Sequence, residues 1–141
     1  METCIFCQIT REEAFSYTIY KNEYVTAFLD KYPVNSGHIL LVTNQHYKTL
    51  DLINNKTISI EIINTLIYIA KKLVNSGFCN DYSILQGNGI NANQEIMHVH
   101  FHIIPRFKSD NVKFLLETDY EAAAEKNMEK TFKKILEVMK T

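Results

Sequence analysis

The sequence has few residues of the kinds that link modules, and it lacks the patterns that direct a chain into a membrane. Its 141 residues include only four glycines and two prolines. So few linker residues leave no flexible segment that could join a second domain to the first. The length of the chain also suits a single domain. No apolar run approaches the roughly 18 residues of a membrane span, and the N-terminus lacks the basic and apolar regions of a secretory signal. We therefore expect one domain over residues 1–141, located in the cytoplasm and not in a membrane.

Neither sign of charge is in excess. Fifteen basic and sixteen acidic side chains leave a net charge of −1. Such a chain has no overall positive field, so it gains little from the counterion release that drives binding to long polyanions. Polynucleotides are therefore not expected as partners. Hydrophobic residues make up 46% of the chain and charged residues 22%, as in ordinary folded domains.

A disulfide scaffold is also absent, because three cysteines are an odd and small number that indicates reducing surroundings. Cys79 stands alone among apolar residues, so we interpret it as structural. Cys4 and Cys7 form a C-x-x-C pair. A redox pair of the thioredoxin type would lie early in a βαβ unit, a context that these residues lack. Two thiolates also supply half of a tetrahedral zinc site, and a pair of reduced, metal-free thiols is the alternative.

Hydrophobic periodicity predicts a mixed α and β domain. Apolar residues at spacings of three and four indicate an amphipathic helix over residues 57–75, closed by Gly77. Thr118 and Glu121 have the spacing of a capping box, which predicts a C-terminal helix over about residues 118–140. Runs of β-branched, aromatic and other apolar residues predict strands at 17–20, 24–30, 38–43, 82–85 and 96–104.

Residues 98–104 read HVHFHII, in which histidines and apolar residues alternate until the final pair. Strand side chains alternate between faces, so His98, His100 and His102 are expected on one face at intervals of about 6.6 Å. The apolar residues between them should face a core. Pro105 is expected to end the strand.

Three interpretations of this row of imidazoles compete. The histidines can be polar residues on a solvated sheet face. They can bind a catalytic Zn²⁺ that leaves a position open for water. They can also include a nucleophile, because an imidazole with a reference pKa of about 6.5 is largely neutral near pH 7 and can attack phosphorus directly.

The sequence resembles the histidine triad (HIT) family of nucleotide hydrolases and transferases, whose motif is His-φ-His-φ-His-φ-φ with φ apolar. Residues 98–104 fit every position of that motif, and Pro105 and Arg106 continue it as in many members. Residues 35–42 resemble the loop and strand of the family, and residues 28–30 resemble its nucleoside-contacting strand. The start, residues 4–9, is similar to that of bacterial-type members. The resemblance therefore covers about residues 4–106.

The resemblance implies an α+β fold with an antiparallel five-stranded sheet, a packed central helix and a C-terminal helix. It also implies a homodimer that binds AMP-like or GMP-like nucleotides. His100 would attack the α-phosphorus of a nucleoside phosphoramidate, a dinucleoside polyphosphate or a related conjugate. The resulting nucleotidyl-histidine would be hydrolysed by water, while His102 and His38 would contact the phosphate and the transferring proton. A nucleotide-binding interaction module with incidental turnover is the alternative function.

The resemblance also implies a nucleotide-binding set. By composition alone, however, Phe6, Ile9, Phe28 and Leu29 are core candidates. Asn93 stands where many members carry Gly, and Asn is the best substitute if that position needs a positive φ. Glu95 replaces the Ser or Thr of the purine phosphoramidase branch, where a carboxylate would protonate a leaving group or repel an anionic substrate. The full set comprises Phe6, Ile9, Phe28, Asp30, Asn88, Gln94, Glu95, Ile96, His100 and His102.

Members that carry the cysteine pair, and related galactose-1-phosphate uridylyltransferases, hold a structural zinc at matching positions. The resemblance thus implies a Cys₂His₂ site for Zn²⁺ formed by Cys4, Cys7, His46 and His98. In this reading His98 belongs to the metal site, while His100 is left free for chemistry.

Overall fold

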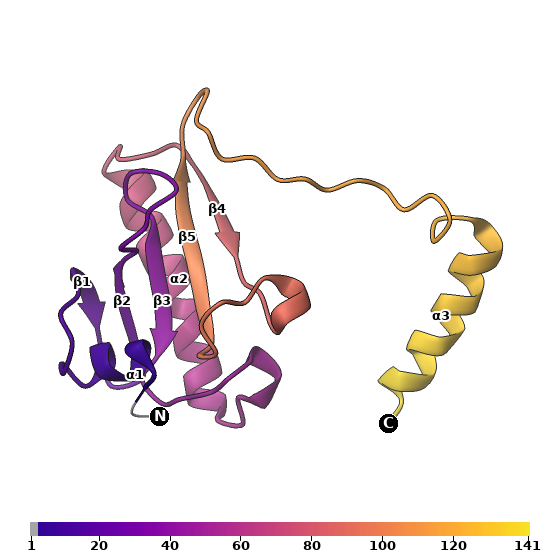
Figure 1. The fold of residues 1–141 in the computed structure, drawn as a ribbon, viewed down its shortest axis with the longest axis horizontal. Helices are drawn as coiled ribbons and strands as arrows, with labels where there is room; N and C mark the ends of the chain where they lie inside the picture. The colour runs from indigo at the N-terminus through magenta and orange to yellow at the C-terminus, as the bar shows by residue number, and fades with distance from the viewer. Residues whose placement is uncertain (1–2) are drawn as a thin grey trace.

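Five antiparallel strands and three α-helices form the part of the chain that the computed structural model describes, residues 3–141 (Figure 1). This architecture confirms the predicted α+β class with a five-stranded antiparallel sheet. In chain order the elements are α1 (Ile5–Thr10), β1 (Thr18–Lys21), β2 (Val25–Leu29), β3 (Ile39–Thr43), α2 (Lys56–Asn75), β4 (Asp81–Leu85), β5 (His100–Arg106) and α3 (Glu125–Met139), with short 3-10 turns at Leu50–Leu52 and Ile90–Ala92.

The sheet has the strand order β1-β2-β3-β5-β4, and its two faces are covered differently. Helix α2 packs on one face, where its buried stripe meets alternate residues of the inner strands such as Leu41, Phe101 and Ile103. Helix α1 lies against the other face, where Phe6 and Ile9 pack with the intervening strand residues. The alternation predicted for the histidine strand therefore holds, because its apolar residues enter the core under α2.

Helix α2 forms where periodicity predicted it. Asn55 caps its start by accepting a hydrogen bond from the backbone N–H of Ile58 at 3.2 Å. Gly77 follows its end with a φ of +77°, a conformation that favours glycine. The helix is thereby confined to one amphipathic segment that crosses behind the sheet (Figure 1).

Strand β5 differs from the prediction at both ends. It begins at His100 rather than at residue 96, because the N–H of His98 turns back to the carbonyl of Ile96 and that of Val99 bonds Tyr47. It also continues through Pro105, which was expected to end it. The pairing with β3 stops at Ile103, so Pro105 has a strand partner only in β4 and its missing N–H interrupts no bond to β3.

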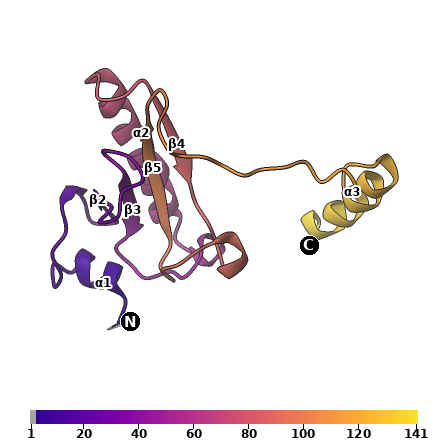
Figure 2. The ribbon, with the colours of Figure 1, turned by 45° about the horizontal axis from the view of Figure 1, so that its top comes forward.

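The predicted capping box at Thr118 and Glu121 is wrong. The backbone N–H of Ala122 bonds the carboxylate of Asp119, which closes a separate turn, and α3 begins only at Glu125 without a side-chain cap. Figures 1 and 2 show an extended segment that carries α3 away from the sheet. All residues of α3 except Asn127 are exposed, including an apolar stripe that contains Phe132 and Leu136.

None of the helices in the described part of the chain combines the length and apolarity that crossing a lipid bilayer requires.

Candidate active site and metal cluster

The three histidines of the motif lie on the sheet face that α1 covers. The ring of Phe6, from α1, contacts the rings of His98 and His100 edge-on at centroid distances of 5.8 and 5.1 Å. The His100 ring in turn lies 5.1 Å from that of His102. The predicted shared face is therefore present, and the apolar ring of Phe6 fills the space beside two of the imidazoles.

His100 has one ring nitrogen committed and one free for chemistry. Its Nδ1 lies 2.7 Å from the backbone carbonyl oxygen of His98, an acceptor, so Nδ1 carries the hydrogen. In the neutral ring Nε2 then keeps its lone pair. The half-buried His100 thus presents the nitrogen that a nucleophile requires.

His38 and His102 form a hydrogen-bonded pair next to His100. The backbone N–H of Val34 donates to His38 Nδ1 at 3.1 Å, so the hydrogen of the neutral His38 ring is on Nε2. This Nε2 lies 2.9 Å from His102 Nδ1 and 3.4 Å from a carboxylate oxygen of Asp30. His102 therefore accepts at Nδ1 and carries its own hydrogen on Nε2.

Burial keeps this pair neutral. The pKa of His102 is lowered to about 4, chiefly by burial and also by the neighbouring His100 and His38, against an opposing effect of Asp30. The pKa of His38 is also lowered by burial, against an opposing effect of Asp30. Both rings are uncharged near pH 7, so they can act as hydrogen-bond donors and acceptors.

Acid is therefore expected to destabilise the fold, because the unfolded chain binds protons at His38 and His102 that the folded chain excludes. The free energy of unfolding should be highest above the ordinary histidine pKa of about 6.5 and should fall as the pH drops below it, by at most about 1.4 kcal/mol per pH unit for each ring. For His102 this decrease should extend to about pH 4. Urea unfolding between pH 7.5 and 5 measures this slope. The variant His102→Gln should have a shallower slope, and an unchanged slope would contradict the assignment.

A second cluster lies at the start of the same row of histidines. Cys4, Cys7, His46 and His98 bring one ligand atom each within 4.8 Å of the others, so they can hold a metal ion. Sulfur-to-nitrogen distances are 3.4 Å from Cys4 to His98, 3.5 Å from Cys7 to His98 and 3.3 Å from Cys7 to His46. The two Nδ1 atoms lie 3.2 Å apart.

These distances fit tetrahedral zinc. Bonds of about 2.3 Å to sulfur and about 2.0 to 2.1 Å to nitrogen place a sulfur about 3.5 Å from a nitrogen and two nitrogens about 3.4 Å apart. The fully buried His98 also has the right tautomer, because its Nε2 donates to the carbonyl of Thr43 at 2.7 Å and leaves the Nδ1 lone pair toward the cluster.

The ionisation of the cluster also favours a cation. Burial, followed by the hydrogen bond and charge of Cys4, raises the pKa of the Cys7 thiol to about 11. Two adjacent thiolates at this site are thus costly unless a positive ion offsets their charge. Burial also lowers the pKa of His98 to about 4, which keeps the ring in the neutral form that metal binding needs.

The apolar members of the predicted nucleotide-binding set belong to the core of this face. Phe6, Ile9 and Phe28 pack together and are 4%, 8% and 3% exposed, and the ring of Phe6 contacts His100. Ile96 packs against them in part. The interpretation as core residues is therefore confirmed for Phe6, Ile9 and Phe28, but it is wrong for Leu29, which is 38% exposed at the end of β2. Contact with a base remains a prediction.

The loop before β5 is held by Gln94. This buried amide accepts from the N–H of Gly89 at 2.7 Å and donates to the carbonyls of Lys48 and Ile96. Asn93 has a φ of +61°, so the left-handed conformation considered for this position is present. Asn88 accepts from the N–H of Leu50, and Glu95 is exposed. The loop ends four residues before His98 in the chain, and the side chain of Gln94 holds it from within.

Sequence reasoning missed the residues that fix the loop before His38. Asn35 was noted only as part of a segment resembling the family, and Asp110 was not considered. The two side chains are hydrogen-bonded at 2.8 Å. The spacing of four between Arg106 and Asp110 was a visible signal, but outside a helix such a spacing does not normally predict contact.

Comparisons with known proteins agree with this architecture. Residues 11–109 match the HIT domain. The chain is 42% identical over 115 residues to a HIT-like protein of Methanocaldococcus jannaschii, a match that covers 79% of this chain and 86% of that protein. It is 38% identical over 103 residues to an adenosine 5'-monophosphoramidase of Saccharomyces cerevisiae, covering 73% of this chain and 62% of the relative.

Solved structures agree as well. A crystal structure of a HIT family protein from Bacillus anthracis is 25% identical, covers 97% of both chains and superposes with a TM-score of 0.86. A zinc-bound histidine triad family protein from Mycobacterium smegmatis, also 25% identical, covers 86% of this chain and 88% of its own with a TM-score of 0.73. Together with the histidine row and the family match over most of its length, these likenesses show that the chain belongs to the HIT family.

Proposed function

We propose that the protein is a nucleotide hydrolase or nucleotidyl transferase that acts at the α-phosphorus of a nucleoside phosphoramidate, a dinucleoside polyphosphate or a related conjugate. The observation that carries the proposal is the free Nε2 lone pair of His100, fixed by the bond from Nδ1 to the His98 carbonyl. The named activity of the yeast relative, an adenosine 5'-monophosphoramidase, supports the same class of substrate.

The reaction proceeds in two displacements. His100 Nε2 attacks the α-phosphorus, a P–N bond forms, and the bond from phosphorus to the leaving group breaks as that group takes up a proton. Water then attacks the phosphorus of the nucleotidyl-histidine and gives up a proton, and the P–N bond breaks to restore neutral His100 and release the nucleoside monophosphate. The proton taken up by the leaving group in the first displacement is thereby returned in the second. Two displacements help because imidazole is a better nucleophile than water and also a good leaving group.

The neighbouring rings support the charge that moves during these steps. His102 presents an Nε2–H that can donate to a phosphoryl oxygen, and its Nδ1 accepts from His38. Asp30, 3.4 Å from His38 Nε2, stabilises positive charge that develops on the pair. The Asp30, His38 and His102 group also has the ligand types of a metal site. The hydrogen bonds already made at both nitrogens of His38 favour a role in proton and charge transfer over metal binding.

Incubation with adenosine phosphoramidate tests the proposal, with release of AMP and ammonia as the expected result. Quenching with alkaline denaturant during turnover should trap an AMP adduct on the peptide that contains His100, detectable by mass spectrometry, because the P–N bond of such an adduct survives in alkali and is hydrolysed in acid. Tight binding of AMP without turnover of any phosphoramidate or dinucleotide would instead support the nucleotide-binding module.

We also propose that Cys4, Cys7, His46 and His98 hold one structural Zn²⁺. The ligand types, their near-tetrahedral spacing and the zinc-bound relative support this assignment. When bound, the ion links α1, the segment after β3 and the segment that leads into β5, and it supplies no step of the reaction. His46 and His98 provide neutral nitrogens, and the two cysteines provide thiolates.

A homodimer is the third part of the proposal, and the flank of α2 nearest β4 supports it. Glu61 and Tyr68 contact residues of the β1–β2 hairpin and so mark the opposite flank of the helix. The exposed apolar residues Ile60, Ile63 and Ile67 follow a separate stripe at helical spacing, turned away from that hairpin. Because β1 and β4 are opposite edges of the sheet, this stripe lies on the β4 side of the helix and is open to solvent.

Strand β4 continues the apolar surface. Tyr82, Ile84 and Leu85 are 41%, 44% and 38% exposed, and β4 has β5 as its single strand partner. An exposed apolar edge strand invites pairing with another chain. A second copy with the same stripe and edge is the partner that matches this surface in chemistry, and the exposed α3 gives each copy a further apolar element.

The variant Ile67→Glu is expected to dissociate the dimer, because it places a carboxylate in the apolar stripe. Sedimentation should give about twice the chain mass of 16.4 kDa for the natural protein and the single-chain mass for the variant. Tyr32→Glu, at a position that is 79% exposed in the loop after β2, is the matched control and should stay dimeric. A monomeric natural protein would contradict this part of the proposal.

A further inference from the structure

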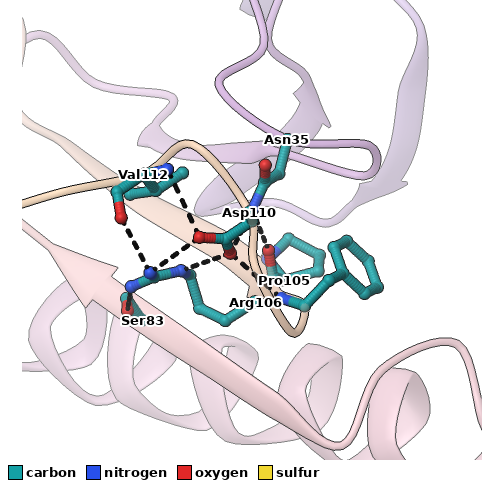
Figure 3. Close-up of polar contacts among 7 residues, drawn as sticks. Asn35, Ser83, Pro105, Arg106, Asp110 and Val112 are labelled. Carbon is teal, nitrogen blue, oxygen red and sulfur yellow. Dashed lines mark hydrogen bonds and ion pairs between the residues drawn. The ribbon is translucent and has the colours of Figure 1, made fainter.

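A cluster of polar side chains lies at the end of β5, where the chain leaves the sheet (Figure 3). Asp110 is its centre, and its side chain is 7% exposed. Arg106 binds both carboxylate oxygens, from Nε at 2.8 Å and from its terminal nitrogen at 3.0 Å. The backbone N–H groups of Phe107 and Val112 bond the same carboxylate. This turn is thus organised around one fixed anion.

The cluster reaches across to the loop that joins β2 to β3. The side-chain amide of Asn35 donates to Asp110 at 2.8 Å and to the carbonyl of Pro105 at 2.9 Å (Figure 3). Both bonds come from one nitrogen with two hydrogens, so its donor capacity is fully used. Asn35 is thereby fastened to β5 and to the turn that follows β5.

The same loop sets the state of His38. The carbonyl of Asn35 accepts the backbone N–H of His38 at 3.1 Å, and the N–H of the adjacent Val34 donates to His38 Nδ1. Gly37 fits closely here, because a side chain at this position would meet Phe78 at 2.6 Å. The loop therefore has a defined position. The His38 ring is hydrogen-bonded at Nδ1 to the loop and at Nε2 to His102.

We propose that Asp110 is a positioning residue for the reaction: through Asn35 it holds the loop whose Val34 N–H keeps His38 in the Nε2–H tautomer, aimed at His102. The inference rests on the proposed function for its consequence on turnover, but the contacts stand independently of any substrate. Asp110 itself touches none of the histidines. If the link to Asn35 is lost, the Val34 N–H is no longer held against Nδ1, and the His38 ring is free to rotate or to exchange tautomers.

Steady-state kinetics of the full chain with adenosine phosphoramidate provide the first test. Asn35→Ala and Asp110→Ala are each expected to lower kcat by about 10- to 100-fold, the usual effect of losing a residue that orients a functional side chain, with little change in KM. The double variant should be no worse than Asp110→Ala, because the two residues act along one path. Ser83→Ala, which removes the contact of Arg106 on the side away from the loop, is the matched control and should retain full kcat.

Nitrogen NMR of the His38 ring provides the second test and needs no turnover. The natural protein and Ser83→Ala should show an unprotonated Nδ1 and a protonated Nε2, whereas Asn35→Ala and Asp110→Ala should show averaged ring nitrogens. Unchanged His38 signals in both variants would overturn the proposal, whatever the activity. If the natural protein turns over no nucleotide, the proposed function fails, while these signals still decide the role of Asp110. If Asp110→Ala does not fold, the half-buried Asn35 allows Asn35→Ala to decide alone.

Discussion

Replacing His100 with alanine is expected to lower kcat for adenosine phosphoramidate by at least about 10⁴-fold, the scale seen when a nucleophile is removed from an enzyme that works through a covalent intermediate. The reason is that water would have to displace the leaving group directly. Binding of AMP, measured by calorimetry, should be largely retained, because the core beneath the site is unchanged. The loss of kcat is measured from the AMP released in reactions that are quenched at successive times.

Two further variants separate the nucleophile from its neighbours. His102→Asn removes another ring of the same face and leaves His100 in place, so the alkali-stable AMP adduct should still form, more slowly. His100→Gly leaves a space into which free imidazole can diffuse, and added imidazole should restore part of the turnover. If His100→Ala keeps its rate, or if the adduct forms on another residue, His100 is not the nucleophile.

Loss of the zinc cluster is expected to have the second largest effect, this time on stability. Cys7→Ser should bring zinc well below one ion per chain and lower the melting temperature by more than about 10 °C, because metal binding energy in such sites is folding energy. The variant also leaves the buried His98 and the half-buried Cys4 and His46 without their shared partner. Elemental analysis and calorimetry measure the two quantities.

Cys79→Ala is the matched control for this variant. Cys79 is also buried but lies outside the cluster, so its replacement should leave the zinc content unchanged. Below the melting temperature of either protein, Cys7→Ser should alter kcat much less than it alters stability. A purified natural protein with clearly less than one zinc per chain, prepared under reducing and chelator-free conditions, would contradict the assignment.

The faces of the fold were predictable from the sequence, but several of its boundaries were not. Buried apolar residues recur with a period of 3.6 along a helix and of 2 along a strand. These periods predicted helix α2 and the face of the strand on which the histidines lie. The ends of β5 depend instead on where a neighbour stops. Pro105 stays in the strand because the pairing of β5 with β3 has already ended at Ile103. The sequence of β5 alone does not show where β3 ends.

Of the candidate site, too, only a part could be predicted from the sequence. The histidine motif is local, so its resemblance to a family identified the nucleophile candidate directly. The tautomers were not readable, because they are set by backbone groups of distant segments: the carbonyl of Thr43 for His98 and the N–H of Val34 for His38. Asp110 was missed for the same reason, since its partner Asn35 lies 75 residues away in the chain.

The bond between His100 and the residue two positions before it has a consequence for how such a protein can change over generations. The acceptor is the main-chain oxygen of His98, which every amino acid at position 98 would also provide. The ring of His98, in contrast, is what serves the metal cluster. If the cluster holds zinc as proposed, descendants of the protein can lose the metal ligands one at a time, provided that other packing takes over the stabilising role of the metal. The main-chain oxygen that orients the ring of His100 is kept throughout.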